Sequence, residues 1–557
     1  VMMGVVLFVS LTVLIFSVGY LADRKKDYAR FYAWVCFFMF SMLLLATAAN
    51  LMVFFIGWEL VGVSSYKLIS FYMDREDAQR AGIKAFILNR IGDAAFLVAM
   101  FAIFRVTGTA DFRELAFAFS KGSIATANAN FIGLMIFIAV AAKSAQIPLY
   151  TWLPDAMTGP TPVSALIHAA TMVTAGIFLM LRLESIFVVA PEASNIVAWT
   201  GGITALLAAF VAVAQTDIKK VLAFSTVSQL GLMVLAVGTG SYVAAFFHLF
   251  THAFFKAMLF LGAGAVIVYR HHEQNIRRMG GIVKAHPFLA ILFWLALIAL
   301  AGLPGLSGFF SKDHIMAAAF SSQKGGLLLG TIAVAASLLT AFYSFRLGIL
   351  VFHGKDRLNA AHDNHHGDLP SVSFYLPLVL LVVPTVLAGY IGVPAFFTGY
   401  EPVFFEKLTI NLPASTMEFF KVARVALDHH AELLVVAASI AVAIVGALAA
   451  IVYYGILRKV PVAEGAYHRT LSRLSLKKLY IDEIYHALFV NPYKKLGDKI
   501  AAWDFNVLPK ISDGIGLLTQ SVCTLVARLQ SGELAHYAAY MVAGVALLLF
   551  IAMGTLA

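Results

Sequence analysis

The chain has 557 residues, of which 61% are hydrophobic and 13% are charged. Soluble globular domains carry about 25% charged residues, so this composition excludes an ordinary soluble enzyme and predicts an all-α protein that crosses a membrane many times. The formal net charge is +10, but the basic residues lie in short loops and the C-terminal part, which is typical of membrane proteins rather than of nucleic-acid binding. The two cysteines, Cys36 and Cys523, are too few to hold an iron–sulfur cluster.

Apolar runs long enough to span a bilayer follow one another along most of the chain. Because about 20 apolar residues cross the hydrocarbon core, runs bounded by charges, glycine or proline predict about fourteen crossings. They cover residues 1–20, 31–49, 50–72, 84–105, 129–158, 162–189, 195–214, 219–238, 240–269, 286–322, 325–352, 372–396, 433–457 and 536–556.

Two of these runs, 129–158 and 286–322, are overlong and interrupted by glycine or proline, with Lys143 and Lys312 near the breaks. Non-helical backbone at membrane depth is tolerated where it is buried in protein or lines a water-filled cavity. Paired broken helices are typical of transporters built from inverted repeats. We therefore predict an initial helix and loop, a first repeat, a second inverted repeat and further crossings, at 1–30, 31–189, 195–352 and 353–457.

The segment 458–535 is too polar to span a membrane. Its core, 480–530, mixes apolar and charged residues at helical spacing, with Pro492 and Pro509 as expected kinks. It would be about 75 Å long as a helix, which predicts a lateral amphipathic helix on the membrane surface, anchored by a last crossing within 536–557. An ordinary cytoplasmic domain is the alternative.

Lysine and arginine are concentrated in alternate loops, which predicts the orientation of the chain. The basic loops expected in the cytoplasm lie near residues 24–30, 75–80, 219–220, 270–284 and 355–357. With an even number of crossings, both ends of the chain are then expected on the opposite side, and the lateral helix on the cytoplasmic side.

Ionisable residues inside apolar runs are the candidates for function, because charge is costly there. Glu59 lies well within its apolar run. It is either a functional acid or a neutral acid that is hydrogen-bonded as part of the packing. Lys67 lies near a helix end and is expected to extend its amine to the membrane surface. Arg90 and Asp93, three residues apart, can pair along one helix face; a structural ion pair and a part in a proton path both remain open.

Lys143 is the strongest candidate. Removing water from a lysine favours its neutral form, so a buried lysine can exchange a proton near neutral pH, unless a carboxylate pairs with it permanently. His168 lies in the middle of the next apolar run and fits a hydrogen-bonded core residue as well as a relay.

His248, His252 and Lys256 fall at i, i+4 and i+8, so they form one polar stripe about 12 Å long on an apolar helix. A line of titratable groups favours a proton relay, while a structural network and a metal or haem site are the alternatives. Lys312, with Asp313 beside it, would end the series at the second break.

Other clusters have weaker patterns. The group His362, Asp363, His365, His366 and Asp368, and residues 271–273, resemble metal-binding tracts by composition alone, and solvated loops are expected. The sequence has no phosphate-binding loop, dinucleotide fingerprint or Ser-His-Asp arrangement, so no redox cofactor, nucleotide or metal site is expected in this chain.

These residues lie in motifs that resemble a known family. GWELVG, NRIGD, the run from Ala141 to Thr174, QTDIKKVLAFSTVSQLG, HAFFKAMLFLGAG and LPGLSGFFSKD are similar to motifs of the antiporter-like subunits of respiratory complex I and the related Mrp-type cation/proton antiporters. The resemblance covers most of residues 1–352. YIDEIYHALFVNPY and the final crossing resemble the family member that carries a long lateral helix.

The resemblance implies a role for each matching residue. Glu59 corresponds to the family's essential membrane glutamate and Lys143 to the central lysine that this glutamate modulates. His168, His248 and His252 correspond to the family's connecting histidines. Lys256 corresponds to the lysine that bridges the two half-channels, and Lys312 to the terminal lysine of the second broken helix. Arg90 and Asp93 also match the pattern, whereas Lys67 stands at a position that is usually apolar. The family's subunit has two more helices before this point, so the sequence is expected to be incomplete at its N-terminus.

The resemblance implies a proton-translocating membrane-arm subunit of NADH:quinone oxidoreductase in a bacterial inner membrane or an equivalent one. FMN, iron–sulfur clusters and quinone are expected in partner subunits, and the lateral helix is expected to contact neighbouring antiporter-like subunits. Lipids and protons are the other expected partners, and nucleic acid is not one. The alternatives are an Mrp-type Na⁺/H⁺ antiporter, a membrane subunit of an energy-converting hydrogenase, and a scaffold whose polar line conducts nothing.

Overall fold

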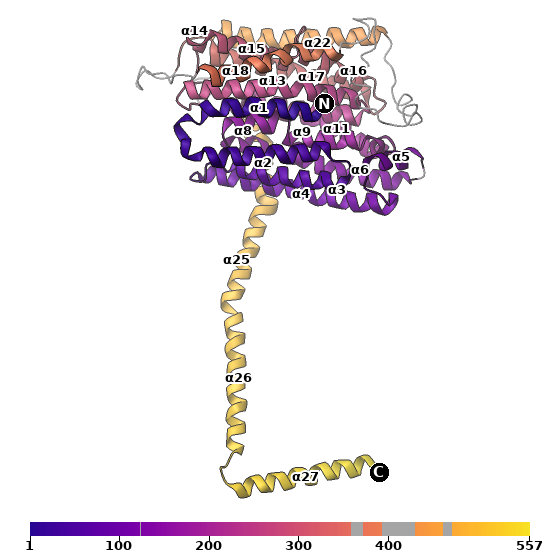
Figure 1. The fold of residues 1–557 in the computed structure, drawn as a ribbon, viewed down its shortest axis with the longest axis vertical. Coiled ribbons are helices and arrows are strands. Elements are labelled where there is room, and N and C mark those ends of the chain that lie inside the picture. The colour runs from indigo at the N-terminus through magenta and orange to yellow at the C-terminus, as the bar shows by residue number, and fades with distance from the viewer. Residues whose placement is uncertain (123, 358–370, 393–428, 460–469, 557) are drawn as a thin grey trace. The chain divides into compact units, whose positions relative to one another are not determined.

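The computed structural model describes residues 1–122, 124–357, 371–392, 429–459 and 470–556 (Figure 1). It divides into two compact units, Val1–Leu479 and Tyr480–Ala557, which are described separately. Strand pairing in the described residues is limited to two isolated bridges, and thirteen described helices are long and apolar enough to cross a membrane. The prediction of an all-α, multi-pass membrane protein is therefore confirmed.

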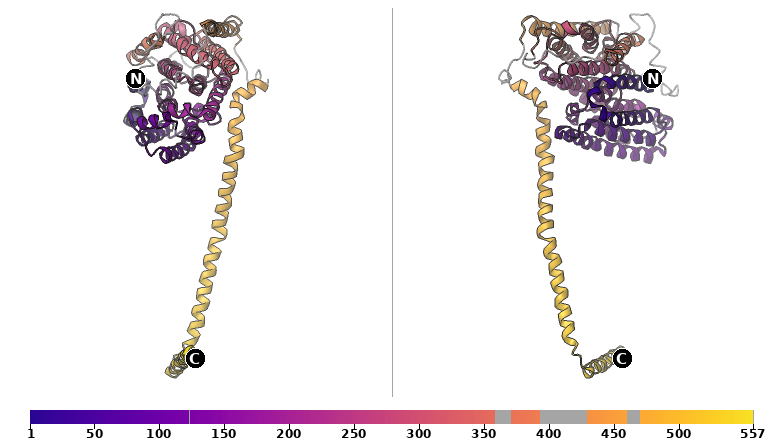
Figure 2. Two further views of the ribbon diagram at one scale, coloured as in Figure 1. Left: turned by 90° about the vertical axis from the view of Figure 1, so that its right-hand side faces the viewer. Right: turned by 60° about the vertical axis from the view of Figure 1, so that its left-hand side comes forward.

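The first unit begins with long helices that lie side by side (Figures 1 and 2). Their bounds are α1 Met2–Tyr20, the 3-10 helix η1 Ala22–Asp27, α2 Tyr28–Thr47, α3 Leu51–Ile69, α4 Glu76–Thr107, α5 Phe112–Ser120 and α6 Thr126–Lys143. The side chain of Asn50 caps α3 by accepting a hydrogen bond from Val53 N at 2.9 Å. Helix α4 begins before the apolar run at 84–105 because its polar first turns, with an Arg80–Glu76 ion pair, are also helical.

The rest of the first unit continues as a bundle. Its elements are α7 Trp152–Asp155, η2 Ala156–Thr158, α8 Thr161–Ala169, α9 Met172–Arg182, α10 Glu184–Val188, α11 Pro191–Ala214, α12 Ile218–Gly238, α13 Tyr242–Tyr269, α14 Ile282–Ala285, α15 Pro287–Ala301, α16 Ser307–Phe320, α17 Gly326–Phe352, α18 Ser371–Leu387, η3 Ala388–Gly392, α22 His429–Ala450, the π-helix η4 Ile451–Ile456 and α23 Thr470–Leu476; η6 Lys478–Tyr480 spans the boundary between the units. The apolar windows of α8–α9 and α12 are wholly buried and that of α13 is 94% buried, so these helices form the core.

The first break in a spanning helix follows Lys143. Helix α6 ends there, and the chain continues through turns and the short helices α7 and η2. The Ser144 hydroxyl donates to Val173 O at 2.7 Å, and Trp152 Nε1 donates to Ala142 O at 2.9 Å. Trp152 therefore satisfies a carbonyl that the interrupted α6 leaves open, and Ser144 ties the chain after the break to α9.

The second break separates α15 from α16. Gly302 and Gly305 lie at φ +81° and +91°, a left-handed conformation that glycine adopts without steric cost. Helix α15 has only 15 residues, so the run predicted at 286–322 is made of two helical pieces, each too short to span alone.

The crossing predicted at 162–189 is present as a candidate span over Thr161–Arg182, but a third break interrupts it. Helices α8, α9 and α10 divide this run, and Thr171, between α8 and α9, has φ −127° and ψ −100°. The Thr171 hydroxyl donates to Leu166 O at 2.5 Å, which replaces a backbone hydrogen bond. The segment around Thr171 contains neither glycine nor proline, so the sequence carries no ordinary signal for this break.

The second unit consists of consecutive helices. They are α24 Ile481–Tyr485, the π-helix η7 His486–Val490, α25 Asn491–Asn506, α26 Leu508–Leu529 and α27 Leu534–Leu556. Pro492 and Pro509 lie in the first turns of α25 and α26, and the π-helix η7 runs directly into α25 just before Pro492. The described residues of α25 and α26 are not buried, and the position of this unit on a membrane surface stays a prediction.

Small residues allow α11 and α12 to approach each other closely. A Cβ atom on Gly231 would lie 2.5 Å from Ala205 N, and Cβ atoms on Gly201 and Gly238 would also meet the facing backbone. Such distances are shorter than real Cβ contacts, so glycine at these positions determines how closely the two helices pack.

We predict that Gly231→Ala separates α11 from α12 and lowers the free energy of unfolding by about 1–3 kcal/mol, as overpacking does. Thermal unfolding in detergent measures the effect. Gly4→Ala is the control, because a Cβ at Gly4 meets nothing within 4 Å and alanine stabilises an open helix position by about 0.5–1 kcal/mol. Equal melting of the two variants would contradict the packing argument.

Candidate functional site

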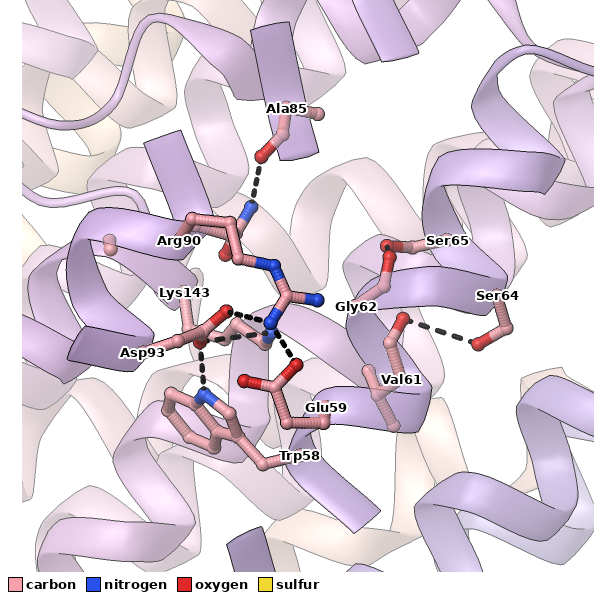
Figure 3. Close-up of polar contacts among 12 residues, drawn as sticks. Trp58, Glu59, Val61, Gly62, Ser64, Ser65, Ala85, Arg90, Asp93 and Lys143 are labelled. Atoms are coloured by element: carbon pink, nitrogen blue, oxygen red, sulfur yellow. Dashed lines mark hydrogen bonds and ion pairs between the residues drawn. The ribbon is translucent and has the colours of Figure 1, made fainter. Parts of the chain in front are cut away.

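Two carboxylates and one arginine meet between α3 and α4 (Figure 3). Arg90 Nη1 donates a hydrogen bond to Glu59 Oε2 and lies 3.4 Å from Asp93 Oδ2. The Asp93 side chain is 6% exposed and that of Glu59 is 22% exposed. The ion pair predicted between Arg90 and Asp93 is therefore present, but Arg90 also bridges to Glu59 on the neighbouring helix.

The Lys143 ammonium lies beside this group, at the end of α6 (Figure 3). Its side chain is 0% exposed, and Nζ lies 3.8 Å from Asp93 Oδ1 and 5.0 Å from the centre of a Trp58 ring. Trp58 Nε1 donates to the same Asp93 oxygen at 2.7 Å. A Cβ on Gly62 would lie 3.1 Å from Nζ, so glycine keeps space beside the amine. Asp93 is thus the near counter-charge of Lys143, and Glu59 acts on it from farther away.

Lys143 Nζ has no hydrogen-bond partner among the described residues. The same holds for both ring nitrogens of His168 on α8, which is 0% exposed. The His168 ring packs 4.8 Å from the Phe260 ring and lies near enough to Lys256 for their charges to interact. Buried polar groups left unpaired by protein are usually satisfied by internal water.

The polar stripe on α13 faces the core. His248 Nδ1 lies 2.9 Å from Ser311 Oγ, and His248 Nε2 lies 3.2 Å from Gln229 Oε1. The ring centres of His248 and His252 are 6.2 Å apart. The predicted stripe is therefore present, with polar side chains from α12 and α16 at its first histidine.

Lys256 continues the stripe toward α12. Its Nζ donates to Ser225 Oγ and to Leu222 O, the latter at 3.3 Å. The ammonium is wholly buried, and these two oxygens supply hydrogen bonds but no negative charge, which makes the charged form costly.

Lys312 and Asp313 lie on α16, just past the second break. Lys312 Nζ donates to Leu300 O at 2.5 Å, one of the carbonyls left open at the end of α15. Ser439 on α22 donates to Asp313 Oδ1. The two residues are 2% and 4% exposed, so this end of the line is also enclosed by protein.

The structure places the candidates in three groups, of which only Glu59 and Arg90 are partly exposed. Glu59, Arg90, Asp93 and Lys143 form the first cluster; His168, His248, His252 and Lys256 lie on the core helices α8 and α13; and Lys312 and Asp313 lie on α16. Buried bases and acids of this kind can take up and release protons.

Several residues that contact the titratable groups were not predicted from the sequence. Trp58, Gln229, Ser225, Ser311 and Ser439 each touch a titratable group. Trp58 and Ser311 directly precede Glu59 and Lys312, a signal that could have found them. The others come from distant helices, which spacing along one helix cannot reveal.

The remaining candidates lie elsewhere. Lys67 is exposed in the last turn of α3, with Nζ 5.1 Å from the Tyr66 ring centre, as expected of a lysine that reaches the surface. The described residues hold no group of three or more His, Cys, Asp or Glu side chains placed to bind a metal. The histidine-rich group at 362–368 falls outside the described residues.

Two family models match the chain. The model "NADH:quinone oxidoreductase/Mrp antiporter, TM" matches residues 48–340. The model "NADH-Ubiquinone oxidoreductase (complex I), chain 5 N-terminus" matches residues 1–32. The first match covers every candidate residue of the series.

Curated relatives extend the similarity over almost the whole chain. NAD(P)H-quinone oxidoreductase chain 5 of Picosynechococcus sp. is 40% identical over 95% of this chain and 82% of its own length. NADH-quinone oxidoreductase subunit L of Rhodobacter capsulatus is 38% identical over 99% of this chain and 87% of its own length.

A solved structure is also similar. A chain of the Mrp complex from Dietzia sp. matches with a TM-score of 0.68 and 26% identity. The match covers 93% of this chain, which spans 55% of the length of that Mrp chain.

We predict that Asp93→Asn destabilises the protein, because it leaves the buried Lys143 without its near counter-charge. Removing one partner of a buried ion pair costs about 3–5 kcal/mol. Adding Lys143→Met should restore much of that loss, since no uncompensated charge then remains. Thermal unfolding of the two variants checks this; equal losses in the single and double variants would contradict the pairing.

Proposed function

The chain belongs to the NADH:quinone oxidoreductase/Mrp antiporter family of membrane subunits, and we propose that it is the subunit L of an NADH:quinone oxidoreductase, which translocates protons across the membrane. Relatives that bear this name or its chain 5 equivalent are 38–40% identical over 95–99% of the chain. The observation that carries the proposal is Lys143, a fully buried lysine 3.8 Å from one carboxylate and without a hydrogen-bond partner among the described residues.

The proton-loading step is proposed to depend on Arg90. Its guanidinium contacts both Glu59 and Asp93. When Arg90 pairs with Glu59, the negative charge of Asp93 interacts mainly with Lys143. This interaction favours the protonated lysine. When Arg90 moves to Asp93, that charge is neutralised and Lys143 releases its proton. Redox-driven change in neighbouring subunits would have to shift Arg90 between the two carboxylates.

The released proton is proposed to pass along the core to Lys312. The path runs from His168 through the α13 stripe, where the imidazoles and Lys256 can each accept and donate a proton. Water is required between Lys143 and His168, because neither has a hydrogen-bond partner among the described residues. The series titrates as a coupled set, so no single step belongs to one residue.

The partners follow from this assignment. FMN, iron–sulfur clusters and quinone are proposed to reside in other subunits, with this chain in the membrane arm beside further antiporter-like subunits. The amphipathic helices α25 and α26 are proposed to lie on the cytoplasmic membrane surface and to contact those neighbours. A bacterial inner membrane, or another energy-transducing membrane, is the proposed location.

An Mrp-type Na⁺/H⁺ antiporter is the second candidate. The likeness to the Mrp complex, with a TM-score of 0.68, favours it, while the higher identity to the oxidoreductase relatives supports the first candidate. Expression of the chain in a host that lacks its own antiporters would then restore growth in sodium, and vesicles would exchange Na⁺ for H⁺ without NADH. These two results would identify the antiporter.

We predict that Lys143→Met abolishes NADH-driven proton translocation, because methionine retains the bulk of the side chain but cannot carry a proton. The measurement is acidification of inside-out membrane vesicles, expressed per assembled complex. Lys67→Met is the control lysine on a spanning helix, and it should leave translocation within about twofold of wild type, as expected of an exposed charge.

Two results would contradict the proposal. If Lys143→Met translocates protons at the wild-type rate, with an unchanged amount of complex, the polar series is a structural network and the chain is a scaffold. Sodium transport without NADH would assign the chain to the antiporter instead.

A further inference from the structure

One carboxylate outside the proton series is shared by two lysines from distant parts of the chain. Asp155 Oδ2 lies 2.6 Å from Lys84 Nζ, and Asp155 Oδ1 lies 2.5 Å from Lys478 Nζ. The Asp155 side chain is 26% exposed, Lys84 28% and Lys478 16%. Because the three groups are largely buried, the pairs are screened less by solvent than surface ion pairs are.

Lys478 belongs to the last segment of the first unit, residues 473–479, called here the docking segment, which is hydrogen-bonded to earlier helices of the same unit. The Ser475 hydroxyl, in a residue 2% exposed, lies 3.1 Å from both Phe210 O and Val211 O at the end of α11. The Tyr150 hydroxyl donates to Lys478 O at 2.7 Å. These hydrogen bonds hold the backbone of Lys478 beside the chain that follows Lys143.

The backbone at the end of this segment is unusual. Lys478, Leu479 and Tyr480 have φ values of +51°, +62° and +59°. Left-handed conformations are costly for residues with a Cβ, and they persist where surrounding contacts determine them. Contacts thus hold Lys478 in a backbone conformation that it does not prefer, two residues before the second unit begins.

Asp155 also connects elements that carry the first cluster. Lys84 lies on α4, six residues before Arg90 and nine before Asp93, which is about 9 and 14 Å along the helix. Asp155 ends α7, the short helix that follows the break after Lys143. The Lys84–Asp155 pair therefore joins the helix of the Asp93 carboxylate to the chain segment that follows its lysine.

We propose that Asp155 is a positioning residue that sets the separation of Asp93 and Lys143, and that Lys478 makes this separation depend on the docking segment. The inference rests on the proposed function, since it concerns proton loading of Lys143. Asp155 transfers no proton itself. It holds α4 and α7 together through Lys84, and the segment that precedes the C-terminal helices strengthens or weakens that hold through Lys478.

A double-mutant cycle on the assembled complex in inside-out vesicles tests the shared carboxylate. In Lys84→Met or Lys478→Met, Asp155 keeps one lysine, so each variant should translocate protons within about threefold of wild type. The double variant leaves the carboxylate without either lysine, and translocation per complex should fall about tenfold or more, well beyond the product of the single effects. Lys478→Arg, which retains the charge, should behave as wild type.

A second readout separates positioning from a structural role. In the double variant, the pH profile of translocation should shift, because the Asp93–Lys143 separation controls when Lys143 takes up a proton. The matched control is Arg80→Met with Arg278→Met, which removes two cations from more exposed ion pairs and should change neither rate nor profile.

Two results would overturn the proposal. One is additive effects of the two substitutions on translocation. The other is an unshifted pH profile with a loss of translocation that matches the loss of assembled complex. If Lys143→Met abolishes translocation while the Lys84 and Lys478 variants behave in this way, the proposed function stands and this inference alone fails. If Lys143→Met translocates normally, the proposed function has failed.

Discussion

The contact between Lys143 and Asp93 is the interaction on which the rest of the site depends. An ammonium with no exposed surface requires a nearby negative charge or must lose its proton. Asp93 supplies that charge at 3.8 Å while also accepting a hydrogen bond from Trp58 and facing Arg90. Asp93 thus faces two cations and one hydrogen-bond donor, and the proposed movement of Arg90 would change how much of its charge acts on the lysine.

The fold makes such a cluster possible by interrupting its helices inside the protein. The break after Lys143 is stabilised by Ser144 and Trp152, and the break before Lys312 by Gly302 and Gly305. Each interruption leaves carbonyl groups beside a lysine, as the Lys312 bond to Leu300 O shows. The histidines lie between the two breaks on α8 and α13, whose apolar windows are almost entirely buried, so the titratable groups are kept away from lipid.

Single-helix patterns in the sequence were sufficient to predict much of this. Apolar runs located the spanning helices, the i, i+4, i+8 spacing gave the stripe of His248, His252 and Lys256, and glycine marked the second break. Contacts between distant helices were beyond such patterns: Arg90 is hydrogen-bonded to Glu59, and Asp155 is shared by Lys84 and Lys478. The break at Thr171 was also missed, because a threonine hydroxyl that bonds to a carbonyl has no distinctive sequence signal.

Protons are proposed to cross the chain's core in step with electron transfer in other subunits. The most direct test is the ratio of protons translocated to NADH oxidised, measured in vesicles that carry wild-type complex or Lys256→Met. Lys256 is wholly buried midway along the series and contacts no carboxylate among its described hydrogen-bond partners. The ratio should be lower in the variant at equal complex content, because methionine cannot carry a proton. An unchanged ratio would show that protons do not travel through this series.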